Sequence, residues 1–232
     1  MLLAVARAAS SHALGADDDE AQRTLDGKQF EIRLRFGCDG QGPVTEGHGW
    51  SVDPDGRTLR LRVVPNLSLD DEPVASVSAE AIEAAEGFWL SRPWLLYAAC
   101  PATPEALESA ATEAKPETSK DDAQAKPPTG TSRLAAQRIG IAQFFTSEDP
   151  RTLRRMNRPF EAVKPLKEGE VVGRQGFNLV LSGRLRSRGD GRVILCVGSG
   201  RDRAPDCVVS ARIDRVWIER PEDRAVMAEW GT

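Results

Sequence analysis

Apolar and charged residues alternate along several short stretches of this chain, with a period of two that is typical of strands with one buried face. The clearest stretches are residues 30–36 and 58–64, in which large apolar residues alternate with Glu or Arg. The second stretch follows residues 50–52 across Asp-Pro-Asp-Gly at 53–56, a sequence that favours a tight turn. These residues therefore predict a β-hairpin.

The segment after the hairpin predicts a helix and then strand-forming residues. Ser78 can cap a short helix over residues 79–86, which carries glutamates in its first turns. Residues 88–90 and 94–97 are dense in aromatic and aliphatic side chains, as strands are. Pro93 lies between them and predicts a bulge or an edge position, because proline cannot donate to a sheet ladder.

The second half of the chain carries the stronger strand signals, with short links that make an antiparallel meander the expected arrangement. A glycine-rich turn at residues 189–191 predicts a hairpin. Residues 147–156 predict a turn that leads into one or two helical turns, and Pro221 is expected to start a short C-terminal helix. The expected strands are 139–145, 177–185, 192–197 and 207–218.

These elements predict a mainly β fold, an antiparallel sheet or meander of sandwich-like or barrel-like form, with two or three short helices and a disordered insert. Leu107 is the only large apolar residue of the insert, so burial cannot offset the entropy lost on ordering it. Whether the two β halves form one domain or two stays open, and one combined domain is favoured. The expected divisions are a signal-like, flexible N-terminus at 1–24, a first β half at 25–100, the insert at 101–133 and a second β half at 134–232.

Composition and charge argue against a transmembrane segment and against nucleic acid as a partner. The chain of 232 residues is 40% hydrophobic and 28% charged, as soluble globular proteins are, and no apolar run is long enough for a transmembrane segment. A net charge of -4 gives no global field toward nucleic acid or membrane, so no nucleic-acid partner is expected. Residues 1–100 are acidic in balance and residues 134–232 basic, which indicates either halves that attract each other or a basic surface.

Four cysteines suit an oxidising compartment, because an even number can pair completely. Cys196 and Cys207 flank a turn between two expected strands, which favours a disulfide across a hairpin. By elimination Cys38 joins Cys100. The alternative is four buried free thiols in a cytoplasmic protein, since free cysteine behaves as a small core residue.

The N-terminus resembles the end of a secretory signal peptide. An apolar stretch over residues 1–6 is followed by Ala13-Leu14-Gly15, with small residues suited to cleavage, and then by an acidic run. Two departures are that no basic region precedes the apolar stretch and that Arg7 interrupts it. With the cysteines, this predicts a periplasmic or secreted protein, and a cytoplasmic location is the alternative.

Residues suited to catalysis or metal binding are sparse. Of the two histidines, His12 lies in the signal-like segment, and no cluster of His, Cys, Asp and Glu has the spacing of metal ligands. No metal site, catalytic residue or cofactor is therefore expected. A dyad of Cys38 and His48 is the exception, because the glycine-rich loop between them can fold back.

Arginines give the second candidate chemistry. Three of them alternate at the end of an expected strand, so they would project from one face of a sheet and could bind an anion. Such a face is more often solvated and paired with acids. The candidate anion-binding residues are Arg184, Arg186, Arg188 and Arg192.

Three functions are consistent with these observations. The favoured one is an exported, non-catalytic module of the cell envelope that binds another envelope protein or contributes structure. The first alternative is an enzyme that uses carboxylates or Cys38 with His48. The second alternative is an anion-binding module that uses the arginine face.

We expect that deleting residues 105–130 leaves the melting temperature nearly unchanged, because this segment has almost no apolar surface to pack on a core. Thermal unfolding of the full chain and of the deletion variant measures the difference. A large drop would show that the segment packs on the rest of the protein.

Overall fold

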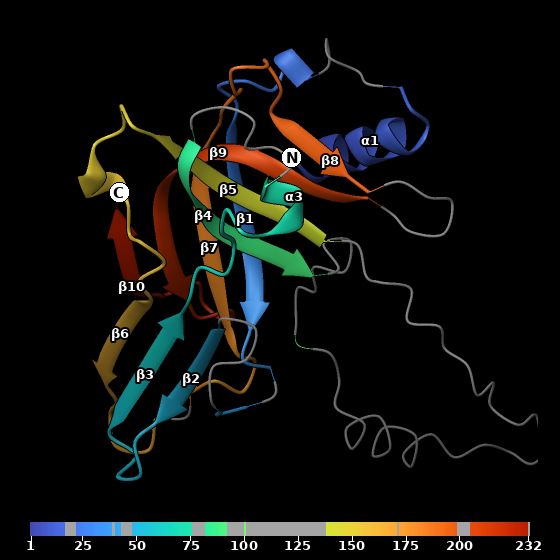
Figure 1. Ribbon diagram of the computed structural model, residues 1–232. Coiled ribbons are helices and arrows are strands. Elements are labelled where there is room, and N and C mark those ends of the chain that lie inside the picture. The colour runs from blue at the N-terminus through green and yellow to red at the C-terminus, as the bar shows by residue number, and fades with distance from the viewer. Residues whose placement is uncertain are drawn as a thin grey trace, which may run out of the picture.

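The strands of this protein form two sheets, shown in Figure 1. A computed structural model describes residues 1–16, 22–38, 40–42, 48–75, 82–91, 100, 138–170, 172–198 and 205–231. The predicted disordered insert, 101–133, lies outside the described residues, and so do residues 94–97, where a strand was expected.

The large sheet has seven strands and the small sheet has three, so the predicted mainly β class is confirmed. The large sheet contains β1 (Gln29–Phe36), β4 (Ile82–Ser91), β5 (Arg138–Thr146), β7 (Phe177–Leu185), β8 (Ile194–Val197), β9 (Asp206–Glu219) and β10 (Val226–Gly231). The small sheet contains β2 (His48–Val52), β3 (Thr58–Val63) and β6 (Phe160–Pro165). The described helical elements include α1 (Leu2–Ala13), α3 (Glu72–Ala75) and the 3-10 turn η2 (Arg151–Leu153).

Both sheets combine strands from the two halves of the sequence. β1 pairs with β7, β4 with β5 and β3 with β6, all in antiparallel register. The predicted hairpin of β2 and β3 is confirmed, with Trp50 opposite Leu61. Aromatic rings join the two sheets: Trp50 meets Phe177 edge-on at 5.7 Å, and Phe88 lies 6.2 Å from Phe160. One core therefore contains apolar side chains from both sheets.

β9 corrects two predictions about strand pairing. It pairs with β5 in parallel, so the large sheet is mixed and not wholly antiparallel. The predicted hairpin of β7 and β8 is also wrong, because both run along the same edge of β9. Ser210 accepts a hydrogen bond from Arg186 N–H at 3.0 Å and donates to the Val193 carbonyl at 2.8 Å. The ladder is thus almost continuous, and residues 187–192 loop out of it.

Two predicted helices are strands or turns in the structure. Residues 82–86, predicted as part of a helix, belong to β4, where Glu86 pairs with Gln143 of β5. The helix predicted from Pro221 is a turn, closed by a hydrogen bond from Arg220 N–H to the Ala225 carbonyl, and β10 follows it. In both cases pairing with a neighbouring strand outweighs a weak local preference for helix.

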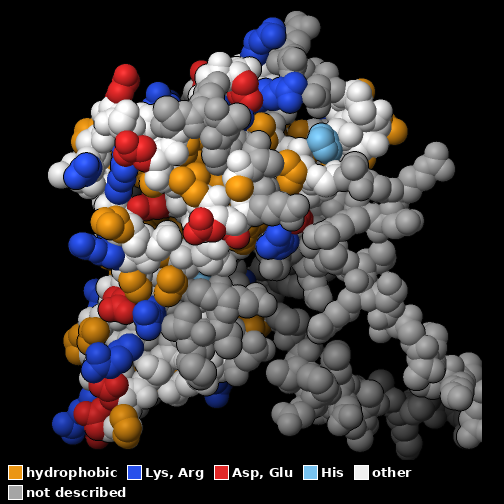
Figure 2. Space-filling model, in the orientation of Figure 1, with side chains coloured by type: hydrophobic (Ala, Val, Ile, Leu, Met, Phe, Trp, Pro, Cys, Tyr) orange, Lys and Arg blue, Asp and Glu red, His pale blue; other side chains and the backbone are white. Residues whose placement is uncertain are grey.

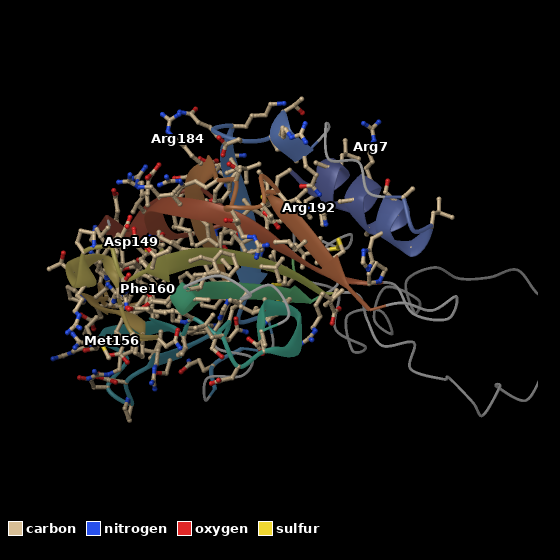
Figure 3. All side chains as sticks on the ribbon, turned by 45° about the horizontal axis from the view of Figure 1, so that its top comes forward. Arg7, Asp149, Met156, Phe160, Arg184 and Arg192 are labelled. Atoms are coloured by element: carbon tan, nitrogen blue, oxygen red, sulfur yellow. A yellow bond between two sulfur atoms is a disulfide. The ribbon has the colours of Figure 1, made fainter. Side chains whose placement is uncertain are left out.

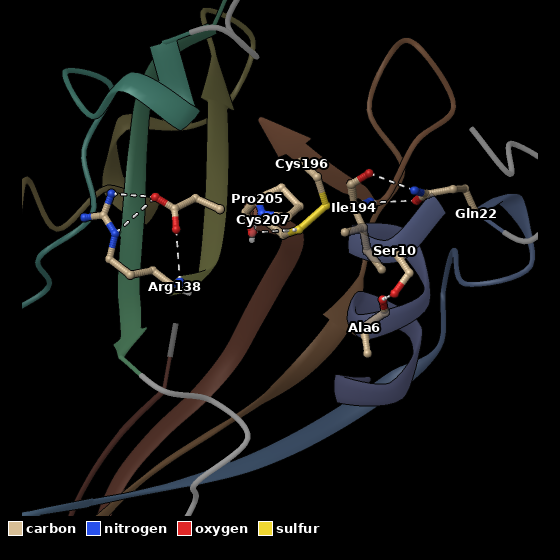
Figure 4. Close-up of a disulfide and its surroundings, with 9 residues drawn as sticks. Ala6, Ser10, Gln22, Arg138, Ile194, Cys196, Pro205 and Cys207 are labelled. Carbon is tan, nitrogen blue, oxygen red and sulfur yellow. Dashed lines mark hydrogen bonds and ion pairs between the residues drawn. A yellow bond between two sulfur atoms is a disulfide. The ribbon is translucent and has the colours of Figure 1, made fainter. Parts of the chain in front are cut away.

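Both predicted disulfides are present. Cys38 is bonded to Cys100, with Cα atoms 5.4 Å apart, and Cys196 to Cys207, with Cα atoms 4.0 Å apart (Figure 4). The second bond crosses directly opposed residues of β8 and β9. The N–H and carbonyl of Ile194 bond to the Gln22 side chain, so they point away from β9. Cys196, two residues on, shares that orientation and lies at a non-hydrogen-bonded position, where opposed side chains are closest.

Two disulfides suggest an oxidising, extracytoplasmic environment. The signal-like N-terminal segment contains α1, which packs against β8 and buries Val5 and Ala9 (Figure 1). Among the residues that the structure describes, no helix has the length and apolar character needed to cross a membrane.

A buried carboxylate on β9 ties three strands of the large sheet together. The Glu219 side chain is 4% exposed and accepts hydrogen bonds from Asn178 at 3.1 Å, Trp217 at 3.2 Å and Arg33 at 3.0 Å. Burial alone would raise the pKa of Glu219, but these three donors outweigh burial and hold that pKa below its usual value.

We expect Glu219→Gln to lower the free energy of unfolding at pH 7 by about 2 kcal/mol, the range of hydrogen bonds to a charged group. The folded pKa lies below the unfolded one, so this contribution is complete above the unfolded pKa and is lost as pH falls through the folded pKa. The difference between variant and wild type should therefore shrink below about pH 4, near the reference value for glutamate. Urea unfolding at pH 7 and pH 3.5 measures it.

Glu229→Gln is the matched control, because Glu229 forms an exposed ion pair with Arg215 and should matter little at either pH. An equal loss of stability for Glu219→Gln at both pH values would contradict the role assigned to the charge.

Candidate functional site

The cysteine predicted as a nucleophile has no free thiol in this structure. Cys38 is bonded to Cys100, and every described cysteine is in a disulfide. His48 lies at the start of β2, where its ring meets Phe36 edge-on at 5.7 Å and Phe88 at 5.9 Å. The disulfide thus leaves the predicted dyad without the thiolate that nucleophilic attack requires.

The four candidate arginines differ in exposure and in their place on the chain. Arg184 is exposed on β7 and Arg186 is exposed just beyond it, in the field of Asp26 and Asp149. The Arg188 side chain is only 11% exposed and bonds to Asp190 at 2.6 Å. Figure 3 shows Arg184 and Arg192 well apart, with Arg192 toward α1.

On the face shown in Figure 2, basic and acidic side chains are interspersed, without a large region of one sign. Anion binding by all four arginines together stays a prediction. The alternation along β7 ends at Leu185, where the strand ends, so Arg188 and Arg192 follow the course of the loop instead of the pleat.

A different segment, the connection between β5 and β6, has unusual backbone geometry. Near the start of this connection, the Asp149 carboxylate accepts hydrogen bonds from Thr146 N–H at 2.7 Å and from the Thr146 hydroxyl at 3.0 Å. The backbone hydrogen bond, above all, holds the pKa of Asp149 below its usual value. η2 follows, in agreement with the short helical turn predicted for this region.

Two arginines fasten the connection to the core. Arg154 bonds to Glu83 at 2.9 Å and to the Thr146 carbonyl at 2.6 Å. The Arg155 guanidinium lies 4.0 Å from the ring centre of Phe160, close enough for a cation–π interaction. Arg154 therefore ties the loop to β4 and β5, and Arg155 ties it to β6.

The connection ends in a strained turn. Met156 and Asn157 both have a φ of 56°, and Arg158 N–H donates to the Arg155 carbonyl at 3.1 Å. Positive φ at both central positions defines a type I′ turn, which favours Asn-Gly. A methionine in the left-handed region costs about 1–2 kcal/mol.

Glu86 holds this turn in place from β4. Its carboxylate accepts one hydrogen bond from Met156 N–H at 2.6 Å and one from Arg155 N–H at 3.0 Å. A charged acceptor for two successive N–H groups offsets the strain of the turn. The backbone conformation is thus imposed by a strand distant in sequence.

The turn presents an apolar side chain to solvent. Met156 is 76% exposed, and Figure 3 shows it at the outer edge of the molecule while Phe160 lies inward. Arg151, Asn157 and Arg158 are exposed around it. We call this surface, formed by Arg151, Met156, Asn157 and Arg158, the Met156 tip.

The sequence did not reveal the Met156 tip. A type I′ turn is normally recognised by Asn-Gly or Asp-Gly, and Met-Asn carries no such signal. The carboxylate that holds the turn, Glu86, lies seventy residues away in the sequence.

No family model, curated protein or solved structure matches this chain.

Replacing the turn by the pair that a type I′ turn favours should stabilise the protein. We expect Met156→Asn with Asn157→Gly to raise the free energy of unfolding by about 1 kcal/mol, because the left-handed strain at position 156 is relieved. Urea unfolding measures the change. Arg224 is exposed and also has a φ of 56°, but it lies outside the tip. Arg224→Gly is therefore the control for the relief of left-handed backbone strain elsewhere in the chain. A less stable double variant would show that the turn is not strained.

Proposed function

We propose that this protein is a non-catalytic binding module of the periplasm or extracellular space, and that the Met156 tip inserts into a partner protein. The two disulfides support the compartment, since such bonds persist outside the cytoplasm. The partner is another protein of the same compartment.

The observation that carries the proposal is a strained turn that Glu86 holds in place to expose a methionine. Strained backbone persists only where the surroundings impose it, and it clusters at functional sites. An exposed Met156 gives the folded chain no burial energy, so the strain has no evident use within the chain. A turn already fixed by Glu86, Arg154 and Arg155 loses little entropy on binding, which favours affinity.

The chemistry of the tip indicates the kind of socket that it fits. Methionine and arginine are enriched in protein interfaces, where an apolar anchor fills a pocket and arginines form pairs around it. Met156 would fill an apolar socket, and Arg151 and Arg158 would meet carboxylates at its rim.

The carboxyl groups also support a non-catalytic role. Among the described residues, the carboxyl groups whose pKa departs from the usual value all depart downward, because each accepts hydrogen bonds or faces a cation. A general acid at neutral pH needs the opposite shift. The groups are Asp26, Asp53, Asp149, Asp190, Glu219, Asp223 and Glu229.

Site-specific cross-linking followed by titration tests the proposal. A photoreactive residue at position 156 should cross-link one partner in cells, and the same residue at Val226, which is 49% exposed, should not. With the purified partner, Met156→Asp should raise the Kd at least tenfold, about 1.4 kcal/mol. Val226→Asp should leave the Kd unchanged.

The variant with Asn-Gly at positions 156–157 separates binding from folding. It should be more stable than the wild type and still bind the partner at least tenfold more weakly, because it lacks the methionine. Equal Kd values for wild type, Met156→Asp and this variant would overturn the proposal.

A further inference from the structure

A groove with a mainly apolar lining lies between α1 and the segment that leads into β1. Its volume is about 490 Å³, within the range of about 300–1,000 Å³ that is usual for small-molecule sites. Leu3, Ala4 and Ala8 of α1 form one wall, Leu25 lies on the opposite wall, and Ile194 of β8 contributes to the lining.

Both walls are fixed to the core. Val5 and Ala9 of α1 are buried, with 0% and 5% exposure. The Gln22 amide donates to the Ile194 carbonyl at 2.8 Å and accepts from Ile194 N–H at 2.8 Å (Figure 4). Gln22 thus takes the place of a neighbouring strand along β8, and the groove has a defined width.

The charged side chains that the described part of the chain contributes to the groove are all basic. Arg7 and Lys28 line it, and no acidic residue of the described chain does. Neither cation forms an ion pair with a described residue. A smaller cavity next to it, about 90 Å³, adds His12 and Arg192. An apolar lining with cations at the rim complements a ligand that has an apolar tail and an anionic head.

We propose that this groove binds a single-chain amphiphile with an anionic head group. The tail lies along Leu3, Ala8 and Leu25, and the carboxylate or phosphate pairs with Arg7 and Lys28. This site is separate from the Met156 tip, so either proposal can fail without the other.

Titration of the full chain with dodecanoate, dodecyl phosphate and uncharged dodecanol, each below its micelle concentration, tests the site. Both anions should bind, and the alcohol should bind at least tenfold more weakly. The ratio between the two anions shows whether a carboxylate or a phosphate head is preferred. Equal binding of all three probes would overturn the assigned role of the cations.

Two double variants of equal charge change locate the site. Arg7→Gln with Lys28→Gln should weaken binding of both anions at least tenfold and leave the melting temperature unchanged, because both side chains are exposed. Arg57→Gln with Lys164→Gln, at two exposed positions outside the groove, should leave binding unchanged. Equal weakening by both pairs would show attraction to net charge only and would overturn the proposal.

The site also requires that α1 stays attached after export. Intact-mass measurement of the protein recovered from its compartment should therefore show residues 1–15 retained. A mature chain that begins at Ala16 would lack one wall of the groove and overturn this proposal, while the proposal for the Met156 tip would stand.

Discussion

The main-chain hydrogen bonds of β9 determine how the rest of the protein is arranged. This strand has 14 residues and is buried along most of its length, so its N–H and carbonyl groups need partners on both edges. β7 and β8 share one edge, and β5 and β10 share the other. Where β5 departs, the Gln143 side chain accepts the Ile213 N–H at 3.1 Å in place of a strand. The connection that carries the Met156 tip leaves β5 close to that point.

The sequence predicted the elements whose signals are local. Period-two alternation identified β1 and β3, because each has one face in the core and one in solvent. The Cys196–Cys207 pairing followed from a turn between two adjacent strands. The Cys38–Cys100 pairing then followed by elimination.

Elements that depend on distant partners were not predictable in this way. Residues 82–86 have the composition of a helix and become a strand because β5 pairs with them. β7 and β8 look like a hairpin in sequence, and only the length of β9 places them end to end. The Met156 tip is the clearest example, because its backbone conformation depends on the Glu86 carboxylate of another strand. No motif or residue spacing in the sequence predicts that contact.

The looped-out residues between β7 and β8 have a consequence for how the chain can vary. Both ends of the loop are hydrogen-bonded to the same residue, Ser210, so the ladder on either side keeps its register whatever the loop contains. A longer or shorter segment at 187–192 gives up contacts of the loop itself, such as the Arg188–Asp190 ion pair and the hydrogen bond from Ser187 N–H to Asp26. Beyond these contacts it changes the closure entropy, which grows slowly with length. The sheet therefore has a permissive insertion point within its own ladder, where a foreign peptide or reporter could be grafted without opening the core.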